Sequence, residues 1–77
     1  EKEAAIQKME YAISIKDNYL QARNELARMY LSVGALTKAR DQYRYSLEKI
    51  APNDQGIKEK LKIVEASLSG QILPKTD

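Results

Sequence analysis

Hydrophobic residues recur along this chain at spacings of three and four, which is the period of one face of an α-helix. Four such stretches span residues 3–16, 19–33, 37–50 and 55–69. Their stripes comprise Ala5, Ile6, Met9, Ala12, Ile13, Ala22, Leu26, Met29, Tyr30, Val33, Ala39, Tyr43, Ser46, Leu47, Ile50, Ile57, Leu61, Val64 and Leu68. No stretch shows the sustained period of two that a half-buried strand requires. The pattern therefore predicts an all-α fold with four helices.

Short polar breaks separate the four predicted helices. Asp17 and Asn18 supply a candidate N-cap for the second helix, and Gly34 stands where a left-handed residue usually follows a helix. Pro52 has no amide hydrogen and disfavours helix in the residue before it, so the third helix should end there. Because loops this short join antiparallel neighbours, we expect helix-turn-helix pairs. Residues 71–77 show no period, and we expect them to form a loose tail.

The chain also repeats itself. A shift of 34 residues sets the first helix on the third, so that Ala5 meets Ala39 and Met9 meets Tyr43. A shift of 35 residues aligns the stripe of the second helix with that of the fourth. The second shift is larger by one, and the single extra residue that it implies lies near positions 49–50. A period of this size is typical of stacked helical repeats.

The middle of the chain resembles a tetratricopeptide repeat, whose period is about 34 residues. The resemblance rests on Leu26, Ala27, Tyr30, Gly34, Leu36, Ala39, Tyr43, Leu47, Ile50 and Pro52. Arg23, Ala27 and Ser46 depart from the Trp, Gly and Ala that the family often has at these places. The resemblance extends from Ala4 to Leu68.

The resemblance implies a right-handed α-solenoid fragment over residues 1–70. Within it, residues 1–18 would be the second half of a repeat, 19–53 one full repeat and 54–70 a capping helix. Each two-helix unit has too much apolar surface to stand alone, and stacking covers that surface. We therefore expect the chain to be the C-terminal piece of a longer array.

In this family the first helix of each repeat lines a concave groove that holds a peptide or helix of a partner protein. The stripe of the second helix that should face this groove contains Gln21, Asn24, Arg28, Leu31 and Ser32. Asn24 would hydrogen-bond a bound backbone, and Arg28 would pair with a carboxylate. The alternative is a solvated face on which Arg28 bonds to Glu25 or Asn24.

The family's best-known groove clamps the C-terminal carboxylate of chaperone tails through Lys and Asn residues. At the corresponding positions Lys60 matches, whereas Glu25 and Gly56 do not. We therefore expect Lys60 to line the groove and do not expect this particular clamp.

The composition of the chain excludes several classes of function. The 77 residues include no Cys and no His, which removes disulfides, thiolate nucleophiles, the commonest general base and the usual zinc ligands. The carboxylates lie on polar faces without an apolar pocket to raise a pKa. No apolar run approaches the length of a membrane span. We expect no enzyme, no cofactor, no metal and no membrane insertion, and a soluble, cytoplasmic setting is slightly favoured.

We accordingly expect a protein–protein interaction module that binds another protein or peptide. One alternative is a purely structural cap of a larger array. A second is an RNA-binding helical repeat, which the net charge of +2 and the interleaved acidic residues disfavour. The first helix should also leave an apolar face open at Ile6, Met9, Ile13 and Ile15, which predicts weak, two-fold self-association.

Overall fold

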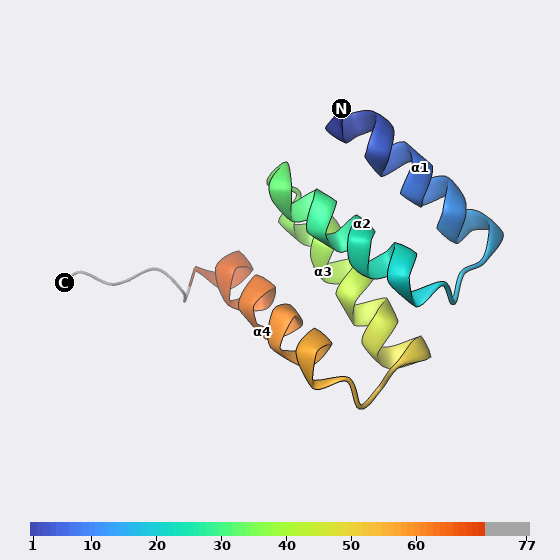
Figure 1. Ribbon diagram of the computed structural model, residues 1–77. Helices are drawn as coiled ribbons and strands as arrows, with labels where there is room; N and C mark the ends of the chain where they lie inside the picture. The colour runs from blue at the N-terminus through green and yellow to red at the C-terminus, as the bar shows by residue number, and fades with distance from the viewer. Residues whose placement is uncertain (71–77) are drawn as a thin grey trace.

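Residues 1–70 are described by a computed structural model, in which consecutive helices run in opposite directions (Figure 1). The elements are α1 (Lys2–Ile15), α2 (Leu20–Ser32), α3 (Leu36–Tyr45), the π-helical turn η1 (Ser46–Ile50) and α4 (Gln55–Ser69). Since no strand occurs within residues 1–70, the all-α prediction is confirmed. The loose tail predicted for residues 71–77 lies outside the described residues.

Two apolar clusters hold the helices together. The first joins buried Leu26, Tyr30 and Ala39, and Ile6, Met9 and Ile13 of α1 pack against it. The second joins buried Ala27, Tyr43, Ile57 and Val64, so that it ties α2, α3 and α4 to one another. Burying such side chains contributes roughly 1.5–3 kcal/mol for each large one. The α2–α3 pair therefore forms the centre of the fold, with α1 and α4 packed on either side of it.

Val33 and Leu68, both on predicted stripes, are exposed, and so is Ile15, which was predicted to lie on an open face of the first helix. Val33 is 46% exposed, because α2 ends at Ser32 and the chain turns away at Gly34, whose φ is +78°. Ile15, in the last turn of α1, is 67% exposed. The expectation of an open face on the first helix was wrong for Ile6, Met9 and Ile13, which are partly buried against the first cluster.

The third helix differs from the predicted α-helix over residues 37–50. It is α-helical through Tyr45 and continues as the π-helical turn η1. At its end the Ala51 amide donates to the Ser46 carbonyl at 2.8 Å, one residue further back than an α-helix requires. A π turn accommodates one extra residue, and η1 contains the positions near which the shift between repeats changes from 34 to 35.

The predicted N-cap at Asp17 and Asn18 was wrong. The N-cap of α2 is Tyr19, and no side chain caps this helix end. The turn is instead held by Arg23, whose Nε donates to the Asp17 carbonyl at 2.9 Å. By contrast, Asp54 caps α4 in the usual way, with its carboxylate accepting from the Ile57 amide at 3.0 Å.

Arg23 is only 9% exposed, although it carries a charge. Its Nη1 donates to Gln42 Oε1 at 2.9 Å, and its guanidinium lies 3.5 Å from the centre of the Tyr45 ring. The flat guanidinium suits both contacts at once, since it can stack on an aromatic ring while it donates in its own plane. Arg23 thus links the α1–α2 turn to α3.

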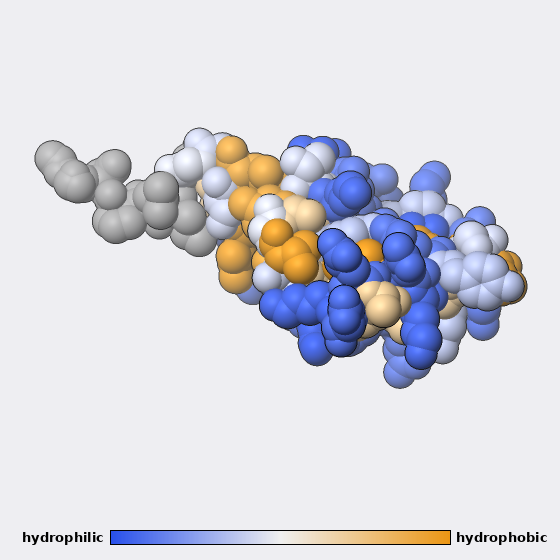
Figure 2. Space-filling view, turned by 90° about the horizontal axis from the view of Figure 1, so that it is seen from above, coloured by the Kyte–Doolittle hydropathy of each residue, from blue (hydrophilic) through white to orange (hydrophobic). Residues whose placement is uncertain are grey.

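Polar side chains dominate much of the surface. Seen from above, apolar side chains gather beside the last turns of α4, and hydrophilic ones cover most of the remaining face (Figure 2). Within residues 1–70, three arginines pair with carboxylates: Arg28 with Glu25, Arg40 with Asp41 and Arg44 with Glu65. Exposed pairs of this kind contribute at most about 1 kcal/mol each.

Candidate functional site

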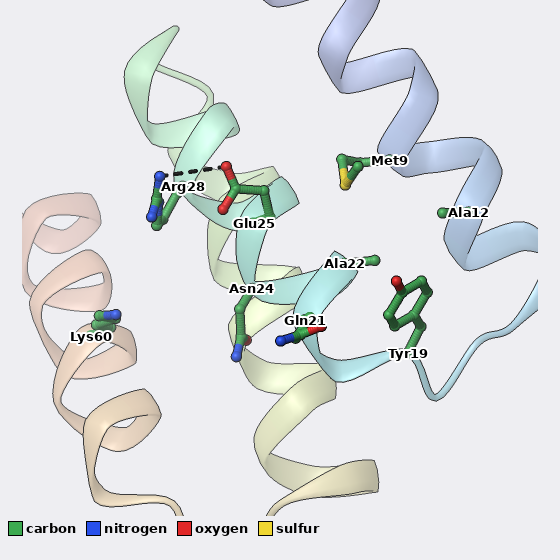
Figure 3. Close-up of a pocket in the computed structure, with 9 residues that line it drawn as sticks. All are labelled: Met9, Ala12, Tyr19, Gln21, Ala22, Asn24, Glu25, Arg28 and Lys60. Carbon is green, nitrogen blue, oxygen red and sulfur yellow. Dashed lines mark hydrogen bonds and ion pairs between the residues drawn. The ribbon is translucent and has the colours of Figure 1, made fainter.

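A hollow of about 540 Å³ lies where α1 and α4 flank the first turns of α2 (Figure 3). Its lining residues are Met9, Ala12, Tyr19, Gln21, Ala22, Asn24, Glu25, Arg28 and Lys60. In Figure 3, α2 lies between a wall formed by α1 and a second wall formed by α4, on which Lys60 stands. A hollow of this size falls within the range that ligand sites occupy.

The structure brings together four of the six residues that the sequence assigned to a groove. Gln21, Asn24 and Arg28 line the hollow from α2, and Lys60 lines it from α4. Leu31 and Ser32 do not line it.

Both exceptions have a structural reason. Leu31 is partly buried and packs against both apolar clusters, so it belongs to the core rather than to the concave face. Ser32 is in the last turn of α2, beyond the hollow, and its hydroxyl donates to the Met29 carbonyl at 2.7 Å.

Five further lining residues were not assigned to the groove. Met9, Ala12 and Ala22 were placed on core stripes, and at the edge of those stripes they also border the hollow. Tyr19 and Glu25 complete the set. The antiparallel path of the chain gives a usable signal, because the side of α1 nearest the start of α2 must border any groove on that helix.

The hollow combines an apolar side with a polar side. Met9, Ala12 and Ala22 supply apolar surface between α1 and α2. Arg28 Nη2 lies 3.4 Å from Glu25 Oε2, and the two side chains are 62% and 40% exposed, so solvent weakens this pair. Lys60 is exposed on the facing wall.

Asn24 gives the hollow its most distinctive polar atom. Its side-chain Oδ1 is buried, yet it has no hydrogen-bond partner within the protein. Buried polar atoms are almost always paired, because leaving one unpaired costs about 1–3 kcal/mol. Because Asn24 is itself a lining residue, a turn of its side chain would bring this oxygen to a donor of a bound molecule.

Two tyrosines with raised pKa values lie outside the hollow. Burial, followed by a hydrogen bond to Glu10, raises the pKa of Tyr30 to about 12. Burial is also the main cause that raises the pKa of Tyr43. Neither ring lines the hollow, so these shifts reflect core packing rather than acid–base chemistry at the hollow.

Residues 1–70 offer neither a metal site nor a membrane span. No group of three acidic side chains in this part of the chain is placed to hold a metal ion. None of its helices combines the length and the apolar character of a membrane span.

Comparisons with protein-family models, with curated proteins and with solved structures gave no match for this chain.

Proposed function

We propose that this chain is a tetratricopeptide-type interaction module that binds a segment of a partner protein in the hollow between α1, α2 and α4. The register of the proposed repeat agrees with the burial pattern. Ala39 and Tyr43 are buried on α3, and their counterparts Ala5 and Met9 are partly buried on α1. The π turn η1 supplies the extra residue that the register requires.

The same proposal includes the arrangement of the repeats. In it, α2, α3 and η1 form one full repeat, α1 is the second helix of a preceding repeat, and α4 caps the stack. Repeats of this kind build a right-handed solenoid whose first helices line the concave side. The position of α2 between the two walls of the hollow supports this assignment.

The observation that carries the binding function is the buried, unpaired Oδ1 of Asn24 beside an apolar wall. An extended peptide offers a backbone N–H to this oxygen, an apolar side chain to Met9 and Ala12, and a charged or polar group to Arg28 and Lys60. Such a peptide would satisfy the acceptor and cover the apolar surface in one step.

The structural-cap alternative is favoured by one observation on α4. Where α2 has buried Ala27, the corresponding residue of α4 is exposed Lys62. A charged outer face is what a terminal repeat needs to remain soluble. Capping by α4 is compatible with binding in the hollow, since Lys62 lies outside the lining set.

RNA binding is less well supported. Arg23 is buried, and the other three arginines of the chain are in ion pairs with Glu25, Asp41 and Glu65. A nucleic-acid site needs a basic patch that is free to contact phosphates, whereas the net charge here is only +2 and acidic residues are interleaved with the basic ones.

The test uses peptides selected by the wild-type chain from a display library, with affinities measured by calorimetry. Asn24→Ala should weaken binding about tenfold, which corresponds to one lost hydrogen bond of about 1.4 kcal/mol. The same substitution should not lower stability, because Asn24 Oδ1 has no partner to lose and its burial without one is unfavourable. Arg28→Glu should weaken the binding of acidic peptides by a similar factor.

Lys62→Glu is the matched control for charge reversal, since Lys62 is exposed on α4 outside the hollow. It should leave every affinity within twofold of the wild type. Selected peptides that bind Asn24→Ala and Arg28→Glu as tightly as the wild type would place binding elsewhere and remove the basis of the proposal.

A further inference from the structure

The face of α1 that points away from α2 carries a second surface, which meets the hollow at Ala12. Ala4, Lys8, Tyr11 and Ile15 follow one another at spacings of four, three and four, which sets them in a line along the helix. We call this line the outer stripe. Tyr11 is 68% exposed and Ile15 is 67% exposed, and these are the largest exposures among the large hydrophobic residues of the described chain.

The outer stripe is not part of the core contact of α1. At 100° per residue, its members lie on the opposite side of the helix from Ile6, Met9 and Ile13, which pack against the first cluster. Of the described elements, only α2 packs closely against α1. In the repeat arrangement proposed above, α1 corresponds to α3, which is packed between α2 and α4. The outer stripe is therefore the side of α1 that the first helix of a preceding repeat would cover, and in this chain that side is open to a second copy.

We propose that two copies of this chain pair through their outer stripes, with the two α1 helices antiparallel about a two-fold axis. The order of residues along the stripe lets the stripe of one copy fit the same stripe of a second copy that runs in the opposite direction. Antiparallel pairing sets Ala4 of each copy opposite Ile15 of the other, which matches a small side chain with a large one. It sets Lys8 opposite Tyr11, which brings a cation to an aromatic ring.

The flanks of the stripe agree with this pairing. On one side lie Ala5 and Ala12, which face each other across the axis and are small enough to let the helices approach closely. On the other side lie Gln7 and Ser14, which are polar and uncharged. These four flanking residues are uncharged, so the pairing brings no like charges together along the flanks. A parallel arrangement would instead stack Lys8 on Lys8 and leave Ile15 beside Ile15 at one end.

The size of the surface sets the strength of the pairing. An α-helix of 14 residues is about 21 Å long, and one face of it buries far less than the roughly 800 Å² per partner of a stable complex. The dimer is therefore weak, with a dissociation constant of about 0.1–1 mM by comparison with low-affinity encounters. This pairing does not depend on the binding function proposed for the hollow.

Sedimentation equilibrium of the full chain from about 10 µM to about 2 mM, a range set by the expected affinity, provides the first test. The weight-average mass should rise from 8.8 kDa towards twice that value. The double variant Tyr11→Lys/Ile15→Lys should remain monomeric throughout, with its helical circular dichroism and melting unchanged. Ile63→Lys is the matched control, because Ile63 is also an exposed apolar residue, at 49%, but lies on α4.

A wild-type chain that stays monomeric at 2 mM would overturn the proposal, and so would an equal loss of association in Ile63→Lys. The orientation has its own test. Because the chain has no cysteine, Ala4→Cys can carry a single spin label. Mixed with isotope-labelled wild type, it should broaden the amide signals of Ile15 more than those of Ala4. The reverse order would contradict antiparallel pairing.

Discussion

Arg23 shows how a single charged residue can be accommodated inside a small helical fold. Its guanidinium donates to the Asp17 carbonyl and to Gln42 Oε1, and it stacks on Tyr45. These three partners belong to a turn and to two positions of α3, so one side chain joins segments that are distant in sequence. Leaving a buried charge without such partners would cost several kcal/mol.

Arg23→Lys tests this account. A lysine keeps the charge but lacks the planar fork, so it loses one hydrogen bond and the stacking contact. We expect a loss of about 1–3 kcal/mol in the free energy of unfolding, measured by urea denaturation. Arg40→Lys is the control, because Arg40 pairs only with its exposed neighbour Asp41. It should change stability by less than about 0.5 kcal/mol, and an equal effect at both positions would contradict the role given to Arg23.

Ser46 is the opposite case, a buried polar residue without a partner. It is fully buried, and its hydroxyl makes no hydrogen bond. Ser46→Ala removes the unpaired hydroxyl while it keeps the backbone and the Cβ, so we expect a gain of about 1 kcal/mol. The measurement is the urea midpoint. A decrease in stability would show that the hydroxyl has a hydrogen-bond partner in solution.

Individual residues were the least predictable part of this fold. The stripes correctly assigned Leu26, Tyr30, Ala39 and Tyr43 to the core, because a helical period identifies the buried side directly. They gave no sign that Arg23 is buried. Its partners Asp17, Gln42 and Tyr45 lie 6, 19 and 22 residues away, and only the folded chain brings them to it.

At the scale of the helices, the pattern was more informative. The predicted bounds of the first, second and fourth helices agree with α1, α2 and α4 to within one residue at each end. The third helix was the exception. A π turn and an α turn show nearly the same spacing of apolar residues, and they differ in which carbonyl accepts each amide hydrogen. In the sequence, the inserted residue was indicated only by the shift between aligned helices, which changes from 34 for the first pair to 35 for the second.

The docking of α4 can be tested through two neighbouring residues. Leu61 packs against the second cluster, whereas Lys62 is exposed on the outer side. Leu61→Ala should lower the free energy of unfolding by about 2 kcal/mol, which is less than for a fully buried leucine. Lys62→Ala should change it by less than about 0.5 kcal/mol. Equal effects of the two substitutions in thermal or urea unfolding would show that α4 docks in another orientation.

At the scale of the whole molecule, the hollow depends on three helices at once. The stripe on the second helix indicated Gln21, Asn24 and Arg28, since those side chains share one side of one helix. The wall formed by Met9 and Ala12 could not be obtained in this way. Its place depends on how α1 packs against α2, and a pattern along a single helix contains no such information.

The central claim is that a partner segment binds in the hollow, and chemical-shift mapping tests it most directly. A peptide selected by the wild-type chain would be titrated into isotope-labelled protein, and the shift of every amide signal would be followed. We predict the largest changes at Ala12, Ala22, Asn24 and Lys60, together with the side-chain amides of Gln21 and Asn24. Changes confined to the outer stripe of α1, or to the surface around Arg40 and Lys49, would contradict the claim.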